Sequence, residues 1–287
     1  MGIGNTLGEA ENVEDTRSDN SSSEIETNYS APAAGCASEI LLLLARSPEP
    51  LSLAEITQSV GRTKSLSFRV LKELQAADLV HKPDGSRYEL GLSALELGAA
   101  VADRLGESSV TREAIRSLSA ETGQTVNVGA LKGFDVMFVM KQEAPRSAVT
   151  ISHVGQRLPA NCSALGKALL MQLDDGEVDQ LMPEELVALT SKTVTDRNAL
   201  LEEVRISRER GFAVDRESAI LGRGAVAVPI KLPHMPEVIA GMAVTASLDD
   251  FDLERTYLLD CVTRARSAIE RVGTAHRTLG TAFGRGG

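Results

Sequence analysis

Between about residues 34 and 91 the sequence carries three helix signals followed at once by a hairpin signal, an order compatible with few folds. The stretch AGCASEILLLLARSPEP predicts a first helix, ended by its prolines. In LSLAEITQSVG, Ser52 and Glu55 form a capping box that starts a second helix, and Gly61 ends it. A third helix is expected from about Thr63 to Ala76, and LVHKPDGSRYEL then places two strand-like runs around a turn. This order is typical of a winged helix-turn-helix.

The third helix combines an apolar side with a cationic one. In a helix-turn-helix this helix enters the major groove of DNA, where its first residues reach base edges and flanking cations bind phosphates. Cations on a surface helix are also compatible with an ordinary solvated face, but the two helices before it and the hairpin after it favour DNA. The predicted DNA contacts are Arg62, Thr63, Lys64, Ser65, Leu66, Phe68, Arg69 and Lys72, with Arg87 of the hairpin reaching a nearby phosphate or minor groove.

Net charge is a poor guide to what this chain binds. Its formal charge is -10, yet residues 1–30 contain seven acids and one base and so hold -6 of it. From Ala33 to Leu90 seven Lys and Arg balance seven Asp and Glu. DNA affinity must therefore come from the placement of the cations and from dimerisation, and a single copy should bind weakly.

The composition changes along the chain divide it into five segments. The first is polar, Ser-rich and too poor in apolar residues to offset its ordering entropy, so we expect it to be disordered. LSALELGAAVADRLG predicts a helix that links two domains or pairs two subunits. The expected segments are a disordered acidic tail (1–33), a winged helix-turn-helix domain (34–91), a linker helix (92–108), an effector-binding and oligomerisation domain (109–275) and a flexible C-terminus (276–287).

The larger domain is predicted to contain a sheet with helices on its faces. QTVNVGALKGFDVMFVMKQ indicates two strands around a turn, while GAVAVPI and EVIAGMAVTAS indicate buried strands. SALGKALLMQL and DRNALLEEVRISRERG indicate helices, and a long terminal helix is expected from about Asp252 to Val272. Strands interleaved with helices make the predicted fold class α+β, with an α/β effector domain.

The sequence argues against an enzyme, a metal site and a membrane protein. GRGAVA at 222–227 runs into a strand instead of opening a helix, ALGKAL lacks the P-loop pattern, and the histidines form no metal-ligand cluster. Cys36, Cys162 and Cys261 are far apart, which favours reduced thiols. The longest apolar runs fall far short of the roughly 20 residues of a membrane span, and the N-terminus lacks the pattern of a secretory signal. We expect no catalytic residue, metal, cofactor or membrane contact, and a cytoplasmic location.

Three motifs give the chain a family resemblance. LSLAEITQSVGRTKSLSFRVLKELQAADLVHKPDGSRYELGLSALELG, VGQRLPANCSALGKALL and RGFAVDRESAILGRGAVAVPI stand in the order and spacing of the isocitrate lyase regulator (IclR) type of bacterial transcription factors, which the chain resembles over roughly residues 35–275. The resemblance implies a winged helix-turn-helix, a linker helix and a GAF-like effector domain. It further implies a dimer or tetramer that binds double-stranded DNA, more often as a repressor, under the control of a small molecule.

The effector site is expected at the start of the SALGKALL helix. Free backbone N–H groups there favour an anion such as a carboxylate, although Ser163 could simply cap the helix without any ligand. The resemblance matches further positions to the family's pocket. The predicted effector contacts are Ala164, Leu165, Gly166, Asp215, Arg223, Ala225, Ala243 and Thr245.

Two departures from the family pattern affect specificity. Ala225 and Ala243 stand where the family commonly has Cys and Ser, so two polar groups are lost and the ligand should be larger or less polar than a small keto acid. Leu66 and Ser67 depart in the third helix, which predicts that Leu66 faces DNA and Ser67 lies nearer the core. A ligand-independent activator, a structural DNA-binding protein and, least favoured, an enzyme remain as alternatives.

Overall fold

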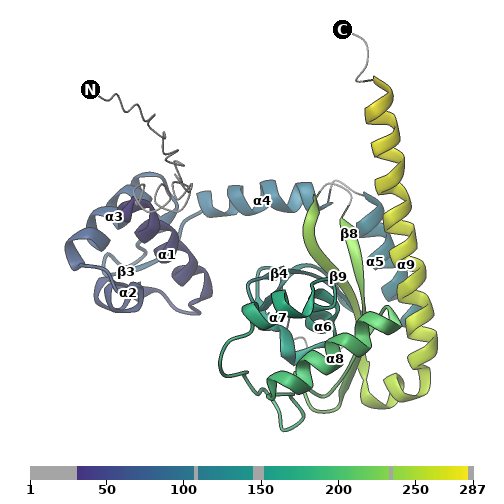
Figure 1. Cartoon of the computed structure of the whole chain (residues 1–287). Coiled ribbons are helices and arrows are strands. Elements are labelled where there is room, and N and C mark those ends of the chain that lie inside the picture. Colours follow the sequence, from purple (N-terminus) through teal and green to yellow (C-terminus); the bar gives the residue numbers. More distant parts are fainter. Residues whose placement is uncertain (1–30, 107–108, 145–151, 233–234, 284–287) are drawn as a thin grey trace, which may run out of the picture. The chain divides into compact units, whose positions relative to one another are not determined.

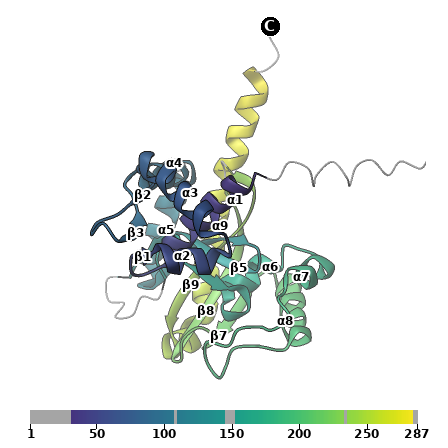
Figure 2. The same ribbon diagram turned by 90° about the vertical axis from the view of Figure 1, so that its left-hand side faces the viewer.

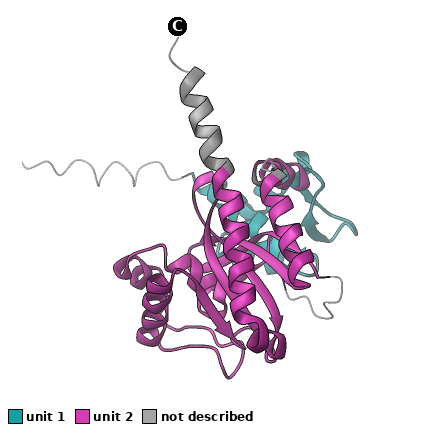
Figure 3. Cartoon of the chain, turned by 90° about the vertical axis from the view of Figure 1, so that its right-hand side faces the viewer, with its two compact units in different colours: residues 1–94 teal, residues 95–287 magenta. Residues whose placement is uncertain are grey.

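The computed structural model describes residues 31–106, 109–144, 152–232 and 235–283. The chain forms two compact units that divide between Ala94 and Leu95 (Figure 1, Figure 3). The predicted acidic tail lies almost wholly outside the described residues. Unit 1 contains α1 (Pro32–Arg46), β1 (Leu51–Ser52), α2 (Leu53–Val60), α3 (Lys64–Ala76), β2 (Val80–His81) and β3 (Arg87–Leu90).

Unit 1 has the predicted winged helix-turn-helix arrangement. Ser52 and Glu55 form the capping box of α2, and Gly61 ends this helix at φ 63°, a left-handed conformation that glycine adopts without strain. The wing is the antiparallel pair of β2 and β3, and β1 joins the other edge of β3. The three helices and the wing enclose one apolar core, which includes Ile40, Ile56 and Leu71.

Unit 2 is built on one antiparallel sheet. Its strand order is β6-β5-β4-β9-β8-β7, so the two longest strands, β8 and β9, lie inside the sheet. The strands predicted from sequence are confirmed as β4, β5, β8 and β9. The elements of this unit, including the helix that spans the division, are α4 (Ser93–Gly106), α5 (Ser109–Thr122), β4 (Thr125–Lys132), β5 (Asp135–Gln142), β6 (Arg157–Pro159), the 3-10 helix η2 (Ala160–Cys162), α6 (Ala164–Leu170), α7 (Asp175–Leu181), α8 (Arg197–Arg210), β7 (Ala213–Arg216), β8 (Arg223–Leu232), β9 (Met235–Ser247) and α9 (Leu248–Phe283).

Helices cover both faces of this sheet. On one face α5 and α9 pack over a core that includes Val226, Val244 and Phe251 (Figure 1). On the other face α6, α7 and α8 pack over a second core that includes Ala227 and Leu169 (Figure 2). Successive strand residues point to opposite faces, so β8 and β9 contribute to both cores. The α+β fold class is confirmed, and no described helix has the length and apolar content to cross a bilayer.

The terminal helix is longer than predicted. α9 begins at Leu248 and continues to Phe283, so residues 276–283, expected to be flexible, continue the helix, and 284–287 lie outside the described residues. The segment contains no proline to end the helix, and its glycines only weaken helix propensity. The linker helix is present as α4, and residues 107–108 of its predicted span lie outside the described part.

Candidate functional site

The first candidate site is the exposed side of α3. Thr63 caps this helix, and Val70, Leu71 and Leu74 bury its other side in the core of unit 1. Ser67 is fully buried, as its predicted place nearer the core requires. The remaining side faces solvent and combines cations, a hydroxyl and an aromatic ring. The exposed side chains are Lys64, Ser65, Phe68, Arg69 and Lys72, together with the acidic Glu73 and with Ala76 at the end of the helix.

Two of the predicted DNA contacts are held by other parts of unit 1. Arg62 donates to the carboxylate of Glu39 from Nε at 2.9 Å and from Nη2 at 2.6 Å. Arg87 donates from Nη1 to the carbonyl of Pro50 at 2.9 Å, and the same nitrogen lies 3.4 Å from Oε2 of Glu55. Both guanidiniums remain partly exposed, so they must share or exchange these partners to reach a phosphate.

The apolar group available on this surface is Phe68, whereas Leu66 was predicted to face DNA. Leu66 is half-buried and packs against the core of unit 1, because it lies one turn before Val70 on the same side of α3. The Phe68 side chain is 44% exposed, and Nζ of Lys72 lies 5.7 Å from the centre of its ring. This places an aromatic ring beside a cation on the surface that would enter the groove.

The tip of the wing is ordered by one carboxylate. Asp84 accepts hydrogen bonds from the backbone N–H groups of Ser86 and Arg87 and from the hydroxyl of Ser86, each at 2.8 Å. The bond from the Arg87 N–H comes first among the causes that lower the pKa of Asp84 to about 2. The turn thereby fixes where Arg87 leaves the wing.

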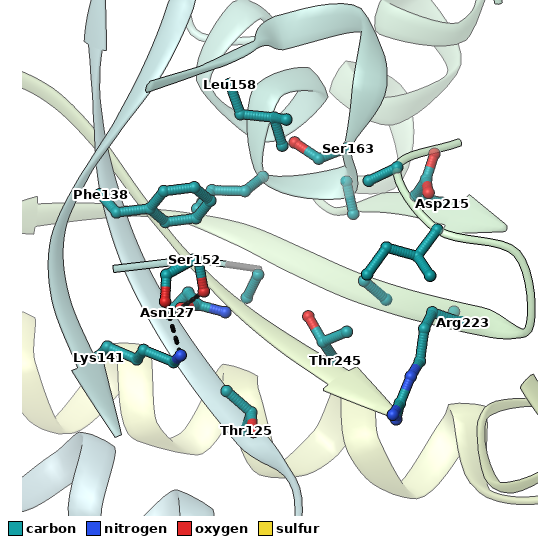
Figure 4. A pocket seen from close by; sticks show the side chains of 17 residues that line it. Thr125, Asn127, Phe138, Lys141, Ser152, Leu158, Ser163, Asp215, Arg223 and Thr245 are labelled. Atoms are coloured by element: carbon teal, nitrogen blue, oxygen red, sulfur yellow. Dashed lines mark hydrogen bonds between the residues drawn. The ribbon is translucent and has the colours of Figure 1, made fainter. Parts of the chain in front are cut away.

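The second candidate site is a cavity of about 90 Å³ in unit 2, between the sheet and the start of α6 (Figure 4). By the estimate of about 10–15 Å³ for each enclosed water, this space suits a ligand of several non-hydrogen atoms. Strand register places side chains on its floor in two rows across the sheet. The first row is Thr125, Thr245, Ala225 and Asp215, and the second contains Asn127 and Ala243.

The structure brings seven of the eight predicted effector contacts to this cavity. Gly166 is the exception. A Cβ at this position would lie 2.0 Å from the carbonyl oxygen of Ala160, so the glycine serves the close packing of α6 on η2. The seven that line the cavity are Ala164, Leu165, Asp215, Arg223, Ala225, Ala243 and Thr245.

Asp215 enters the cavity already paired. Its Oδ1 lies 3.2 Å from Nζ of Lys167, its Oδ2 accepts from the Ser218 N–H at 3.1 Å, and Glu203 binds the same ammonium at 2.7 Å. Burial alone would lower the pKa of Lys167, but the charges of Asp215 and Glu203 outweigh it and raise that pKa. Lys167 therefore stays charged and neutralises Asp215.

The ammonium group of Lys141 also has partners within the protein, whereas the guanidinium of Arg223 has none in the described residues. Nζ of Lys141 donates to the carbonyl of Ser152 at 2.6 Å and lies 2.8 Å from Oε1 of Glu143. Ser152 also donates from its hydroxyl to Oδ1 of Asn127 at 2.9 Å. Among the residues that the structure describes, Arg223 has neither a hydrogen-bond nor an ion-pair partner for its guanidinium. Within the described residues, the cavity thus contains one positive charge without a partner.

Sequence reasoning missed the half of the cavity that β4 and β5 supply. Polar Thr125 and Asn127 alternate with buried Val126 and Val128, a signal that marks one face of β4 as polar. The other contributions come from separate segments that only the folded sheet brings together. The missed lining residues are Thr125, Asn127, Phe138, Lys141, Ser152, Leu158, Ser163, Ala219, Ile220 and Gly224.

Comparison with known proteins matches both units. Residues 37–84 match the family profile "IclR helix-turn-helix domain", and residues 99–271 match "Bacterial transcriptional regulator IclR C-terminal". The chain is 30% identical over 208 residues to the HTH-type transcriptional repressor AllR of Escherichia coli K12. The aligned region covers 72% of this chain and 76% of AllR.

Solved structures agree with this match. A crystal structure from Silicibacter sp. TM1040, named as an ICLR transcriptional regulator, has a TM-score of 0.74 and 27% identity, and the match covers 84% of this chain and 96% of that one. An IclR homolog from Microbacterium hydrocarbonoxydans, complexed with 4-hydroxybenzoate, has a TM-score of 0.71. The match covers 85% of this chain and 99% of that chain. At 19% identity the likeness shows the fold alone.

Proposed function

Because the chain belongs to the IclR family of bacterial transcriptional regulators, we propose that it is a repressor that a small carboxylic acid releases from its operator. The chain is a DNA-binding regulator with a helix-turn-helix and a C-terminal effector-binding domain. Repression is supported by its likeness to AllR, a named repressor. The proposed DNA contacts are the exposed side of α3 and Arg87 of the wing.

The observation that carries the effector proposal is the chemistry of the cavity. It contains Arg223, whose guanidinium has no partner in the described part of the chain, and its floor carries the methyl groups of Ala225 and Ala243. A cation in a partly apolar, partly enclosed space favours an anion with an apolar body. A carboxylic acid fits this description. The structural neighbour complexed with 4-hydroxybenzoate holds a compound of that class.

We also propose that the active form is a dimer or tetramer located in the cytoplasm. α4 exposes the apolar side chains Leu95, Leu97 and Val101, which suit a helix that pairs with a second copy. Two copies would bind two half-sites, and the weak binding of one α3 would be multiplied by the second. Light scattering of the full chain tests this, because a monomer at operator-binding concentrations contradicts it.

The test of the proposed function is a binding titration of the full chain against a fluorescent duplex from the region upstream of its own gene. We expect tight, salt-sensitive binding that 4-hydroxybenzoate or another aromatic acid weakens. A scrambled duplex of equal length is the control for specificity. Binding that is equal on both duplexes would contradict the regulator, and specific binding that no carboxylic acid changes at millimolar concentration would contradict the effector.

A further inference from the structure

The cavity that the proposed function assigns to an effector contains three charged side chains, and two of them are satisfied by the protein. Asp215 is neutralised by Lys167, and Lys141 lies against Glu143 and the Ser152 carbonyl. Arg223 alone among the charged lining residues has no partner in the described part of the chain. The charge that a ligand must supply is therefore a single negative one, and it belongs at Arg223.

The position of Arg223 suits a carboxylate. It is the first residue of β8, opposite Ser247 of β9, and it points to the same face of the sheet as Ala225. Its side chain is half-buried, which limits screening by water without removing access. A guanidinium offers two parallel N–H groups to the two oxygens of a carboxylate, a match that a point charge does not provide.

Asn127 supplies a second, neutral recognition group. Its side chain is 94% buried, and Oδ1 is occupied by the hydroxyl of Ser152 at 2.9 Å. With the oxygen held in this way, the NH2 group is the free end of the amide, and in the described residues it has no partner (Figure 4). A free amide N–H is a donor, so the ligand atom beside it must be an acceptor.

The two groups lie on opposite sides of the cavity. Figure 4 places Asn127 with Lys141 on one side and Arg223 on the other, with Thr245 between them. β9 separates β4 from β8, and Asn127 stands level with Ala227, four residues along β8 from Arg223. The backbones of Asn127 and Arg223 are therefore two strand spacings apart across the sheet, about 10 Å, and four residues apart along it, about 13 Å. The walls between them are apolar at Phe138, Leu158 and Ile220. A two- or three-carbon keto acid is too short to reach both groups.

The start of α6, predicted from sequence as the anion site, is the weaker anchor. The helix has only seven residues, and the Ser163 hydroxyl already accepts from the Gly166 N–H at 3.0 Å. Its apolar residues Ala164 and Leu165 close one side of the cavity without contributing a charge. The start of α6 therefore shapes the space, and the charge comes from β8.

We infer that Arg223 and Asn127 together select the effector, as a monocarboxylic acid with an apolar body whose carboxylate binds Arg223 and whose far end carries a neutral oxygen that accepts a hydrogen bond from Asn127. This inference rests on the proposed effector function of the cavity. It narrows the ligand from carboxylic acids in general to those with an acceptor at the opposite end.

The test measures binding of three probes to the full chain by calorimetry: 4-hydroxybenzoate, benzoate and 4-hydroxybenzamide. Wild type should bind 4-hydroxybenzoate most tightly. Arg223→Gln should weaken both acids at least about tenfold, the worth of a lost charge-assisted hydrogen bond, and leave the amide unchanged. Arg223→Lys should recover part of the loss, because it restores the charge without the fork.

Asn127→Ala should remove the advantage of 4-hydroxybenzoate over benzoate while benzoate binding persists. Arg210→Gln, an exposed arginine of α8 outside the cavity lining, is the matched control and should change nothing. Melting curves verify that each variant is folded.

The outcomes separate the inference from the function on which it rests. If 4-hydroxybenzoate binds Arg223→Gln as tightly as wild type and still releases DNA, Arg223 is not the anchor and the effector function stands. If none of the three probes binds wild type at millimolar concentration, the inferred ligand class is wrong. The proposed release of the protein from DNA by a carboxylic acid is contradicted too if no other carboxylic acid releases the DNA.

Discussion

Glu39 of α1 holds the guanidinium of Arg62 through two hydrogen bonds, one from Nε at 2.9 Å and one from Nη2 at 2.6 Å. The same contact comes first among the causes that lower the pKa of Glu39 and raise that of Arg62, so the pair stays ionised at all ordinary pH. Arg69, by contrast, is exposed on α3 and has no partner among the described residues. Of the two arginines predicted to contact DNA, Arg62 must therefore give up a partner within the protein to do so, whereas Arg69 need not.

Replacing Arg69 with alanine should reduce operator affinity more than replacing Arg62. We expect Arg69→Ala to weaken binding by about 1–3 kcal/mol if it contacts a base, and Arg62→Ala to weaken it less, because Arg62 must first loosen its bonds to Glu39. Arg46→Ala, in the last turn of α1, is the control. Anisotropy titrations give the affinities, and an Arg69 variant that binds like wild type would remove α3 as the DNA-reading helix.

Removing the negative charge of Glu39 should strengthen DNA binding. In Glu39→Gln the guanidinium of Arg62 is free to bind a phosphate, and one more phosphate contact should steepen the slope of log affinity against log salt by about 1. The slope is measured by titrations at several salt concentrations. The double variant Glu39→Gln with Arg62→Ala should lose the gain, and an unchanged slope in the single variant would show that Arg62 does not reach DNA.

Breaking the buried pair of Lys167 and Asp215 should destabilise unit 2 strongly. The Lys167 side chain is only 5% exposed, and Asp215→Ala leaves it with Glu203 as its one acidic partner. Loss of a buried ion-pair partner costs about 3–5 kcal/mol of unfolding free energy. Since the pKa of Lys167 is raised above 10.5, this stability is present at neutral pH and is lost only as the pH rises through the folded-state value. Urea unfolding of wild type and Asp215→Ala measures the difference in unfolding free energy. Asp175→Ala, which breaks only exposed pairs, should have a far smaller effect.

Two glycine replacements should have opposite effects. A methyl group at Gly166 would meet the backbone of Ala160 at 2.0 Å, which the packed core cannot relieve, so Gly166→Ala should cost about 1–3 kcal/mol or more. Gly98 in α4 has nothing within 4 Å of its added methyl, and Gly98→Ala should stabilise the helix by up to about 1 kcal/mol. Thermal melts of both variants decide this, and a neutral Gly166→Ala would contradict the close contact.

The wing should lose a stabilising contact in acid. The pKa of Asp84 is lowered from 3.8 to about 2, so its contribution to folding is complete above about pH 4 and disappears as the pH falls through about 2. Carboxyl carbon shifts in an NMR titration report this pKa directly. Asp84→Asn should make the backbone N–H of Arg87 exchange faster at neutral pH, and an Asp84 that titrates near 3.8 would contradict the hydrogen bonds at the turn.

Unit 1 was predictable from sequence because its signals are local. The capping box of Ser52 and Glu55 and the Gly61 stop act within one helix each, and both are present in the structure. The strand β1 was not predicted, since its two residues are extended only through pairing with Arg87 and Tyr88, far along the chain. α7 was also overlooked, although Asp174 and Glu177 form a capping box that the sequence displays.

The cavity was only half predictable for a related reason. The residues around α6, β8 and β9 were found through the family resemblance, whereas Asn127 and Phe138 enter it through the pairing of β4 with β9 and β5. Strand register decides which side chains share a row, and register is set by the whole sheet. The sequence also does not show which charged side chains pair with one another, because Lys167 and its partner Asp215 are 48 residues apart in the chain.

The alternation of side chains along β9 separates two kinds of evolutionary change. Ala243 and Thr245 face the cavity, while Met242, Val244 and Ala246 between them lie in the core beneath α5 and α9. A mutation at one of the first two positions alters what the cavity accepts and leaves the other core intact. In the proposed function, the ligand preference of this protein can therefore change through single substitutions on one side of a strand, without rebuilding the packing on the other side.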